Sequence, residues 1–363
     1  MAGIMACMQL VILLLFLPFV RSYDTTVIPA DKSQLSSWFD QNVGPASVRK
    51  GSLDPALEAA EAGAKVIKVR TDGSGDFKTV NDAIKSIPTG NKDRVILWIG
   101  PGNYTEKIKI DRYKPFITFY GDSNNMPSLI YDGTAAEYGT VDSATLIVES
   151  DYFSAVNVKI VNSAPRPDGV RKGAQAVALR IGGDKASFYN CKIYGFQDTL
   201  CDDKGKHFFK DCYIEGTVDF IFGSGRSLYL NTETYVIPGD GMAMITAQAR
   251  TKVDESNGYV FAHCKVTGTG NHAYLGRAWM PYARVVYAYS EFSDAVNPEG
   301  WSNNLDAQNN KTVYFGEYNN KGPGSAQGKR AGFTKKLNDA EAKQFITLGF
   351  IEGSKWLLPP TKL

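Results

Sequence analysis

The sequence predicts an all-β fold, a solenoid of parallel β-strands, on three observations. The first is a near-repeat of 21 residues, in which 188–198 (FYNCKIYGFQD) is followed by 209–219 (FKDCYIEGTVD). The second is a series of short alternating apolar runs, spaced by roughly 20–35 residues. The third is a composition with 35 Gly, 19 Tyr and 19 Phe, which suits a turn-rich β protein. A short β-rich unit repeated every 20–25 residues is typical of the coils of a parallel β-helix.

The expected elements follow this pattern along the chain. A polar leader at 23–64, with a helix at 53–64, precedes the repetitive body at 65–357 and a short tail at 358–363. We expect a strand at 66–70, a turn at 72–76, a helix at 79–86, a strand at 94–100 and a turn at 101–103, and then strands at 107–110, 117–120, 144–149, 155–161 and 176–181. Loops at 163–173 and 268–281 are long enough to build a cleft on one face, and 338–349 is expected to be a helix that covers the solenoid.

The first 22 residues resemble a secretory signal. Their apolar run at 8–20 is too short to span a bilayer, and small residues at Val20 and Ser22 suit cleavage, although a positive N-terminal region is missing. An uncleaved membrane anchor is the alternative. We expect a secreted protein of the cell wall or extracellular space, without a membrane span after cleavage.

Charge and cysteine content narrow the class further. The net charge is +2, and about +1 without Arg21, so a dedicated nucleic-acid binder is not expected. Four cysteines remain after the signal: Cys191, Cys201, Cys212 and Cys264. Three of them share a local pattern (FYNC, FKDC, FAHC), which favours buried thiols at inward coil positions; four cysteines allow three connectivities, and stacking favours Cys191–Cys212 if a bridge forms. Asn103 and Asn310 lie in N-x-T sequons and are candidate glycosylation sites.

The repeat also carries the strongest chemical signal. In a β-helix, equivalent positions stack about 4.8 Å apart, so Asp198 and Asp219 are expected side by side. Two carboxyls at this separation share a proton, and their pKa values split. The pair then supplies an acid together with a base or nucleophile. Asp is also a common turn residue, so a purely structural role is the competing interpretation.

Three more side-chain types point to the same place. Gln175 lies 22 residues before Gln197, one coil away, so two amide groups can offer N–H donors to an oxyanion. A surface amide ladder is the alternative. Arg277 is a candidate partner for one Asp, and Trp279 is either a platform for a sugar ring or a core residue. His207, His263 and His272 show no metal-ligand spacing, so no metal is expected.

In combination, seven segments resemble the plant pectin methylesterases, carbohydrate esterases with a right-handed parallel β-helix fold. They occur in family order over about 65–357: 72–80 (DGSGDFKTV), 101–106 (PGNYTE), 175–180 (QAVALR), 197–200 (QDTL), 216–223 (GTVDFIFG), 275–279 (LGRAW) and 298–301 (PEGW). The resemblance implies hydrolysis of the C6 methyl esters of homogalacturonan, giving methanol and de-esterified pectin without a cofactor.

The resemblance also implies residue roles. Asp219 matches the nucleophile, Asp198 the general acid and base, and Gln175 and Gln197 the oxyanion-binding amides. Arg277 matches the residue that orients the nucleophile. Trp279 and, less closely, Thr140 match substrate contacts, with Gln175 and Arg277 also touching substrate. As partners it implies pectin and a proteinaceous inhibitor, and we expect a monomer.

The chain departs from the family pattern at three places. Ala278 stands where the family has proline, and 224–227 (SGRS) replaces a common Asn-Ala-Ala segment. The cysteine that commonly pairs with the position of Cys212 falls near Thr232, so that disulfide is expected to be lost. Only about 40 residues lie between the signal and the body, so an inhibitor-like pro-region is not expected, as in the short forms that include pollen allergens.

Two other classes compete. A pectate lyase needs a calcium-binding carboxylate cluster, and a polygalacturonase needs carboxylates placed for glycosidic cleavage. The Gln, Asp and Arg set suits ester chemistry better. A pectin-binding lectin that kept the fold without catalysis is the non-enzymatic alternative.

Overall fold

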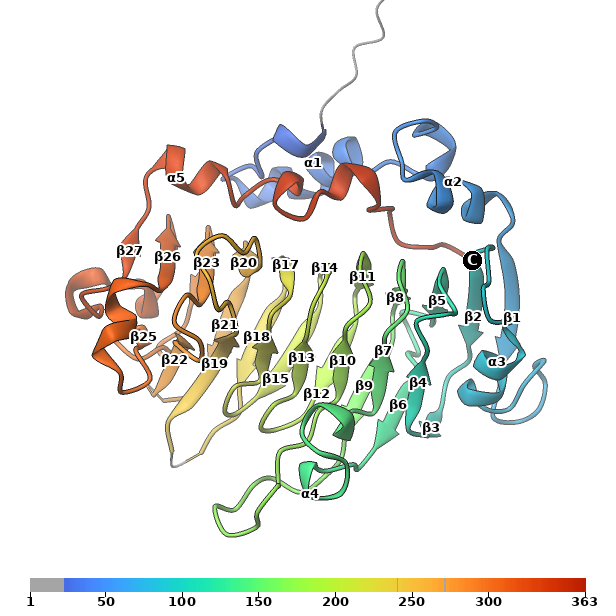
Figure 1. Cartoon of the computed structure of the whole chain (residues 1–363), viewed down its shortest axis with the longest axis horizontal. Helices are drawn as coiled ribbons and strands as arrows, with labels where there is room; N and C mark the ends of the chain where they lie inside the picture. The colour runs from blue at the N-terminus through green and yellow to red at the C-terminus, as the bar shows by residue number, and fades with distance from the viewer. Residues whose placement is uncertain (1–22, 240, 271) are drawn as a thin grey trace, which may run out of the picture.

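The computed structural model describes residues 23–239, 241–270 and 272–363, so the predicted signal segment lies outside the described residues. The body is a right-handed parallel β-helix, which confirms the predicted fold class (Figure 1). Three parallel sheets run along its length, and each coil passes from sheet 1 to sheet 3 to sheet 2 before returning to sheet 1.

Sheet 1 has 11 strands among the described residues. They are β1 (Lys65–Val69), β2 (Val95–Ile99), β5 (Ile117–Tyr120), β8 (Ser154–Val156), β11 (Ala186–Tyr189), β14 (Lys206–Lys210), β17 (Arg226–Leu230), β20 (Gly258–Ala262), β23 (Arg284–Ala288), β26 (Tyr314–Tyr318) and β27 (Lys335–Lys336).

Sheets 2 and 3 have eight strands each in the same part of the chain. Sheet 2 contains β4 (Ile108–Ile110), β7 (Leu146–Val148), β10 (Leu179–Ile181), β13 (Leu200–Asp202), β16 (Ile221–Gly223), β19 (Ala243–Gln248), β22 (Ala273–Arg277) and β25 (Trp301–Ser302). Sheet 3 contains β3 (Asn103–Thr105), β6 (Ser128–Tyr131), β9 (Lys159–Asn162), β12 (Lys192–Tyr194), β15 (Tyr213–Gly216), β18 (Glu233–Val236), β21 (Lys265–Gly268) and β24 (Glu291–Phe292).

The 21-residue repeat is the pitch of one coil. Phe188 pairs in register with Phe209, and Ile193 with Ile214. Inside the solenoid the aromatic rings of successive coils stack at centroid distances of 4.4–4.7 Å, along the column Phe188, Phe209, Tyr229, Phe261 and Tyr287. This column shows one use of the aromatic residues, because stacking on the next coil buries the ring faces inside the solenoid.

The cysteines follow the predicted pattern. All four are buried free thiols, and Cys191, Cys212 and Cys264 belong to the interior core. Thr232 is buried beside Cys212, where its hydroxyl accepts a 3.4 Å hydrogen bond from the Cys212 N–H. A hydroxyl therefore occupies the place where the sequence comparison expected a second thiol.

The leader and the C-terminal segment cover the outer face of sheet 1, side by side (Figure 1). The leader contains η1 (Tyr23–Thr25), η2 (Lys32–Gln34), α1 (Leu35–Asn42), η3 (Ala46–Val48) and α2 (Pro55–Ala62), and the C-terminal segment contains α5 (Asp339–Lys343), η8 (Leu348–Ile351) and η9 (Gly353–Lys355). Backbone hydrogen bonds of 2.8 Å join Ile28 to Ile346 and Asp54 to Lys355. Leucine, tryptophan and phenylalanine side chains of α1 pack on the sheet, which explains why this short helix is stable.

The remaining helical elements are α3 (Val80–Ser86), α4 (Ala135–Tyr138), η4 (Val141–Ser143), η5 (Ala307–Lys311), η6 (Pro323–Ser325) and η7 (Gln327–Lys329). α3 begins after Thr79, whose hydroxyl accepts from the Asp82 N–H, as expected for an N-cap. α5 has a capping box between Asn338 and Glu341, but it ends at Lys343. The expected helix at 338–349 is therefore wrong in length, because a 3₁₀ turn follows it.

Two other expectations need correction. The single strand expected at 155–161 is two strands, β8 and β9, separated by a corner at Asn157 with φ 57°. The loop expected at 268–281 contains β22, so Arg277 is the last residue of a strand. In both cases the local pattern hides a boundary that is set by pairing with the neighbouring coils.

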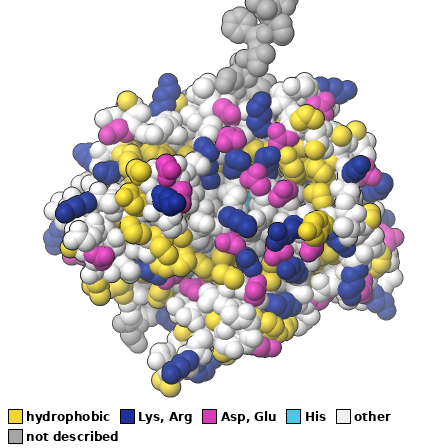
Figure 2. Space-filling view, viewed as in Figure 1, with side chains coloured by type: hydrophobic (Ala, Val, Ile, Leu, Met, Phe, Trp, Pro, Cys, Tyr) yellow, Lys and Arg dark blue, Asp and Glu magenta, His cyan; other side chains and the backbone are white. Residues whose placement is uncertain are grey.

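In the described part of the chain, no helix is long and apolar enough to cross a membrane. Positive and negative side chains are interspersed on the face shown in Figure 2. This distribution agrees with the small net charge and gives no extended field of one sign on that face.

Candidate active site

The candidate site lies on sheet 2, where each coil turns in from sheet 3. Asp198 comes just before β13 and Asp219 just before β16, and these strands pair in parallel with Leu200 opposite Ile221. The two aspartates therefore occupy equivalent positions one coil apart, as the repeat predicts, and the Asp198 N–H donates to the Val218 carbonyl at 3.0 Å.

Both aspartates have left-handed backbone conformations, with φ 66° at Asp198 and 50° at Asp219. This region is uncommon for residues other than glycine, although Asp and Asn tolerate it better than most. Such conformations persist where the surrounding structure enforces them, and they concentrate at functional sites. The turn interpretation and the chemical one are thus compatible, since each Asp occupies a turn and also faces the cavity.

Arg277 reaches Asp219 from β22, two strands further along sheet 2. Its Nε and Nη2 donate to the two carboxylate oxygens at 2.7 Å each, and its Nη1 donates to Asn304 Oδ1 at 3.1 Å. Both side chains are largely buried, with 19% of Arg277 and 12% of Asp219 exposed. A forked, shielded pair of this kind fixes the orientation of the carboxylate and places a full positive charge against it.

Asp198 has the opposite environment. Burial, together with the negative charge of Asp219, raises the pKa of Asp198 to about 8, and the Arg277 charge offsets only part of this shift. At neutral pH Asp198 therefore keeps its proton while Asp219 is held by a guanidinium. The site contains a carboxylic acid beside a carboxylate.

A cavity of about 350 Å³ opens over this pair. It is lined by Thr140, Val141, Gln175, Gln197, Asp198, Asp219, Phe222, Ala247, Arg277 and Trp279. The seven residues predicted as catalytic or substrate-binding all line it, although they come from five separate chain segments. Within the described residues, neither the Gln175 nor the Gln197 side-chain amide has a hydrogen-bond partner in the protein, so both are available to a ligand.

Trp279 forms one wall of the cavity. Its ring is 37% exposed and meets the buried Phe222 ring edge-on, at a centroid distance of 6.0 Å. Phe222, Val141 and Ala247 were not predicted from the sequence. Their only signal was apolar character, which does not distinguish the lining of a cavity from a core.

A second cavity, of about 590 Å³, shares Gln197 with the first. Arg166, Pro167, Asp168 and Gly169 line it from the loop at 163–173, and other lining residues include Ile237, Gly239, Gly241, Met242 and Ala243. The predicted loop thus does border a cleft. The two sequon asparagines, Asn103 and Asn310, are exposed and lie outside both cavities.

A cavity with a carboxylic acid, an arginine-held carboxylate and two unpartnered amides on a β-helix offers the groups that ester hydrolysis uses: a nucleophile, an acid and donors for an oxyanion. The sequence model described as Pectinesterase matches residues 66–354. Pectinesterase 2 of Olea europaea is 67% identical over 96% of this chain and 95% of its own length. Pectinesterase of Parthenium hysterophorus shows the same identity and coverage, and Probable pectinesterase 50 of Arabidopsis thaliana is 56% identical over 95% of each chain.

Solved structures agree. The pectin methylesterase from carrot superposes with a TM-score of 0.75 and 32% identity, over 81% of this chain and 97% of that one. The deglycosylated enzyme from Aspergillus niger gives a TM-score of 0.68 at 29% identity, over 79% of this chain and 94% of that one. The chain belongs to the pectinesterase family, and it is an enzyme that hydrolyses the methyl esters of pectin. The lyase, polygalacturonase and lectin alternatives are thereby set aside.

Proposed function

We propose that Asp219 is the nucleophile of this esterase and Asp198 its general acid and base, acting on the C6 methyl esters of homogalacturonan. The observation that carries the proposal is the forked Arg277–Asp219 pair beside a carboxyl whose pKa is raised to about 8. Two adjacent carboxyls in opposite protonation states can supply the nucleophile and the proton for the leaving group at one ester.

In the first half-reaction, a carboxylate oxygen of Asp219 attacks the ester carbonyl carbon. The carbonyl oxygen becomes an oxyanion, which the side-chain amides of Gln175 and Gln197 stabilise by donating hydrogen bonds. When the intermediate collapses, the C–O bond to the methoxy group breaks, Asp198 donates its proton and methanol leaves. An anhydride then joins Asp219 to the galacturonate unit.

In the second half-reaction, a water molecule attacks the galacturonate carbonyl carbon of this anhydride. Asp198, now a carboxylate, accepts a proton from the water, and the bond to Asp219 breaks. The products are a galacturonic acid carboxyl in the chain, which then releases its proton to solvent, and the original carboxylate of Asp219, so both aspartates regain their starting protonation states.

The remaining cavity residues suit substrate binding. Trp279 offers a partly exposed ring for stacking on a sugar, while Thr140, which is half-buried, lines the same cavity. The extension of the cleft past Gln197 gives room for neighbouring units of the polymer.

The cellular setting belongs to the same proposal. The first 22 residues serve as a secretory signal, 23–64 as a packed leader and 65–357 as the catalytic domain, in a monomer that acts in the cell wall. Asn103 and Asn310 carry glycans, and a proteinaceous inhibitor is a candidate partner. The apolar run at 8–20 and the exposed sequons support these assignments, and the secreted protein's N-terminal sequence and mass test them.

The test of the mechanism is methanol release from highly methylated pectin. Asp219→Asn keeps the shape and tolerates the left-handed backbone, but it removes the nucleophilic charge, so release should fall to background. Asp211→Asn is the matched control, because Asp211 also occupies a coil corner with φ 58° but lies away from the cavity. Appreciable release by Asp219→Asn would refute the assigned nucleophile.

A further inference from the structure

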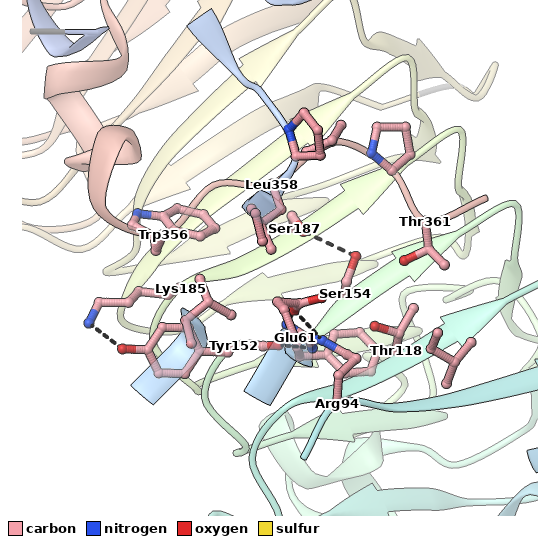
Figure 3. A pocket seen from close by; sticks show the side chains of 17 residues that line it. Glu61, Arg94, Thr118, Tyr152, Ser154, Lys185, Ser187, Trp356, Leu358 and Thr361 are labelled. Atoms are coloured by element: carbon pink, nitrogen blue, oxygen red, sulfur yellow. Dashed lines mark hydrogen bonds and ion pairs between the residues drawn. The ribbon is translucent and has the colours of Figure 1, made fainter. Parts of the chain in front are cut away.

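A third cavity, lined partly by polar side chains, lies on sheet 1, on a different face of the solenoid from the catalytic residues. Its volume is about 240 Å³, and Figure 3 shows the side chains that line it. The floor comes from β2, β5, β8 and β11, one wall from the leader, and the roof from the C-terminal segment at 356–361. The mechanism proposed above uses none of these residues.

The floor is a row of hydroxyls in an otherwise apolar row of the sheet. Thr118, Ser154 and Ser187 stand in register on successive coils. The same row continues through Phe208, Leu228, Val260 and Val286, which pack under the covering helices. The row therefore changes from apolar side chains under the covering helices to hydroxyls at the cavity, where Ile96, next to Thr118, also contributes to the lining.

One of these hydroxyls lacks a partner. Thr118 is 1% exposed and its Oγ1 has no hydrogen bond among the described residues, although it lines the cavity. Ser187 donates to Ser154 at 3.2 Å, which leaves further donor and acceptor capacity on the pair. Because burying an unpaired hydroxyl is costly, the cavity is suited to a polar occupant.

The charged groups around the cavity are already matched. Arg94 donates to Glu61 at 2.7 Å and to the Tyr152 carbonyl at 2.7 Å, while Lys185 pairs with Asp54 at 2.8 Å and donates to the Tyr152 hydroxyl at 3.0 Å. Among the described residues that line the cavity, no cation remains unpaired and able to bind an anion, so the electrostatics favour a neutral occupant over an acidic one.

Two aromatic and two prolyl side chains also line the cavity, namely Tyr152, Trp356, Pro359 and Pro360. Figure 3 shows the Tyr152 and Trp356 rings among the lining side chains. Hydroxyls together with aromatic or prolyl faces match a sugar ring, which has O–H groups at its rim and C–H groups on its face. The volume is below the roughly 300–1,000 Å³ of sites for drug-sized ligands, so it suits one ring.

We propose that this cavity binds one ring of a neutral sugar, as a second carbohydrate contact remote from the catalytic cleft. Such a site would hold the enzyme on a neutral branch of a wall polysaccharide while the cleft receives the acidic, methylated chain. The inference does not depend on the assignment of the catalytic aspartates.

Binding is tested on the whole chain by saturation-transfer NMR and calorimetry, with galactotetraose, arabinotetraose and xylotetraose as neutral probes and tetragalacturonate as the acidic one. At least one neutral probe should bind the wild type. Thr118→Val removes one hydroxyl at nearly constant shape and should weaken that binding about tenfold, the value of one hydrogen bond. Methanol release from soluble pectin should stay unchanged, because Thr118 is not in the catalytic cavity.

Thr334→Val is the matched control, since Thr334 also has a buried, unpartnered hydroxyl but does not line this cavity. It should leave sugar binding unchanged. If Thr118→Val does not fold, Ser154→Ala makes the same test on the neighbouring coil. The proposal is overturned if no neutral probe binds the wild type, if both threonine variants bind equally well, or if only tetragalacturonate binds in a Thr118-dependent way.

Discussion

Arg277 and Asp219 come from strands two coils apart, yet they form a two-pronged ion pair with both N–O distances at 2.7 Å. Because parallel coils stack in register, residues 58 positions apart in the chain are neighbours on one sheet. The solenoid thus fixes the orientation of the proposed nucleophile by pairing between strands rather than by a flexible loop.

Arg277→Lys tests this geometry. Lysine keeps the charge but cannot make two parallel hydrogen bonds, so the carboxylate loses its fixed orientation. We expect kcat for methanol release to fall about 10–100-fold, because a hydrogen bond to a charged group contributes about 1.5–3 kcal/mol. Arg226→Lys, which changes a 3.1 Å pair with Glu352 on another face, is the control and should change kcat less than threefold. Equal effects of both substitutions would contradict the role of the fork.

The protonated state of Asp198 predicts a pH dependence. Its pKa is raised to about 8, so the acid form needed to protonate methanol is lost as pH rises through that value. We expect kcat/KM for methylated pectin to fall on the alkaline side with an apparent pKa near 8. In Asp198→Asn the rate should drop by about 10²–10⁴ and this alkaline limb should disappear. An unchanged limb in the variant would assign it to another group.

The raised pKa of Asp198 also makes the stability of the folded protein depend on pH. The unfolded chain releases the Asp198 proton near pH 4 and the folded chain only near 8, so folding takes up a proton between these values. The free energy of unfolding contributed by this residue therefore decreases as pH rises from about 4 to 8. Asp198→Asn should be more stable than the wild type by a margin that grows over this range and then levels off. Thermal unfolding at pH 4, 6 and 8 measures it, and a margin that shrinks with pH would show that Asp198 ionises normally.

The free amides give a prediction on rate alone. Gln175 and Gln197 make no side-chain hydrogen bonds within the described part of the protein, so removing either should leave the melting temperature nearly unchanged. Gln197→Ala should lower kcat about 10²–10³-fold through the loss of one oxyanion donor. Gln308→Ala, at an exposed position outside the cavity, is the control. A large loss of stability with a small loss of rate would assign Gln197 to structure instead.

The coil repeat predicted the fold and the pairing of four of the seven cavity residues. Stacking makes positions 21 or 22 residues apart into neighbours, so Asp198 with Asp219, and Gln175 with Gln197, could be paired from the sequence. Arg277 and Trp279 have no repeat partner and became candidates through their residue types, whereas Thr140 came from the family resemblance alone.

What the sequence did not predict depends on packing between distant segments. Phe222 and Val141 line the cavity, but an apolar residue gives no sign of which wall it forms. The corner at Asn157 was hidden inside a run of apolar residues, and the end of β22 at Arg277 is set by pairing with β19 and β25. The hydroxyl row at Thr118, Ser154 and Ser187 has irregular spacing in sequence, because the intervening loops differ in length.

A buried ion pair next to the site gives the last prediction. His207 Nδ1 lies 2.5 Å from Asp202 Oδ1, both side chains are fully buried, and the Tyr229 hydroxyl donates to the other carboxylate oxygen at 2.7 Å. Burial alone would lower the pKa of His207, but the Asp202 charge and hydrogen bonds to Asp202 and Gly183 raise it above its ordinary value of 6.5.

A raised histidine pKa stabilises the fold fully below pH 6.5, and this contribution is lost as pH rises through the folded-state value. His207→Leu leaves the Asp202 carboxylate buried without its cation and should lower the free energy of unfolding by about 3–5 kcal/mol. His207→Gln, which can still donate a hydrogen bond, should lose less stability and should lack the part of the alkaline decline that His207 contributes. Denaturant unfolding of the wild type and the two variants at pH 6 and pH 9 measures these differences in the free energy of unfolding. A histidine that stabilised the fold equally at both pH values would mean that the pair is neutral.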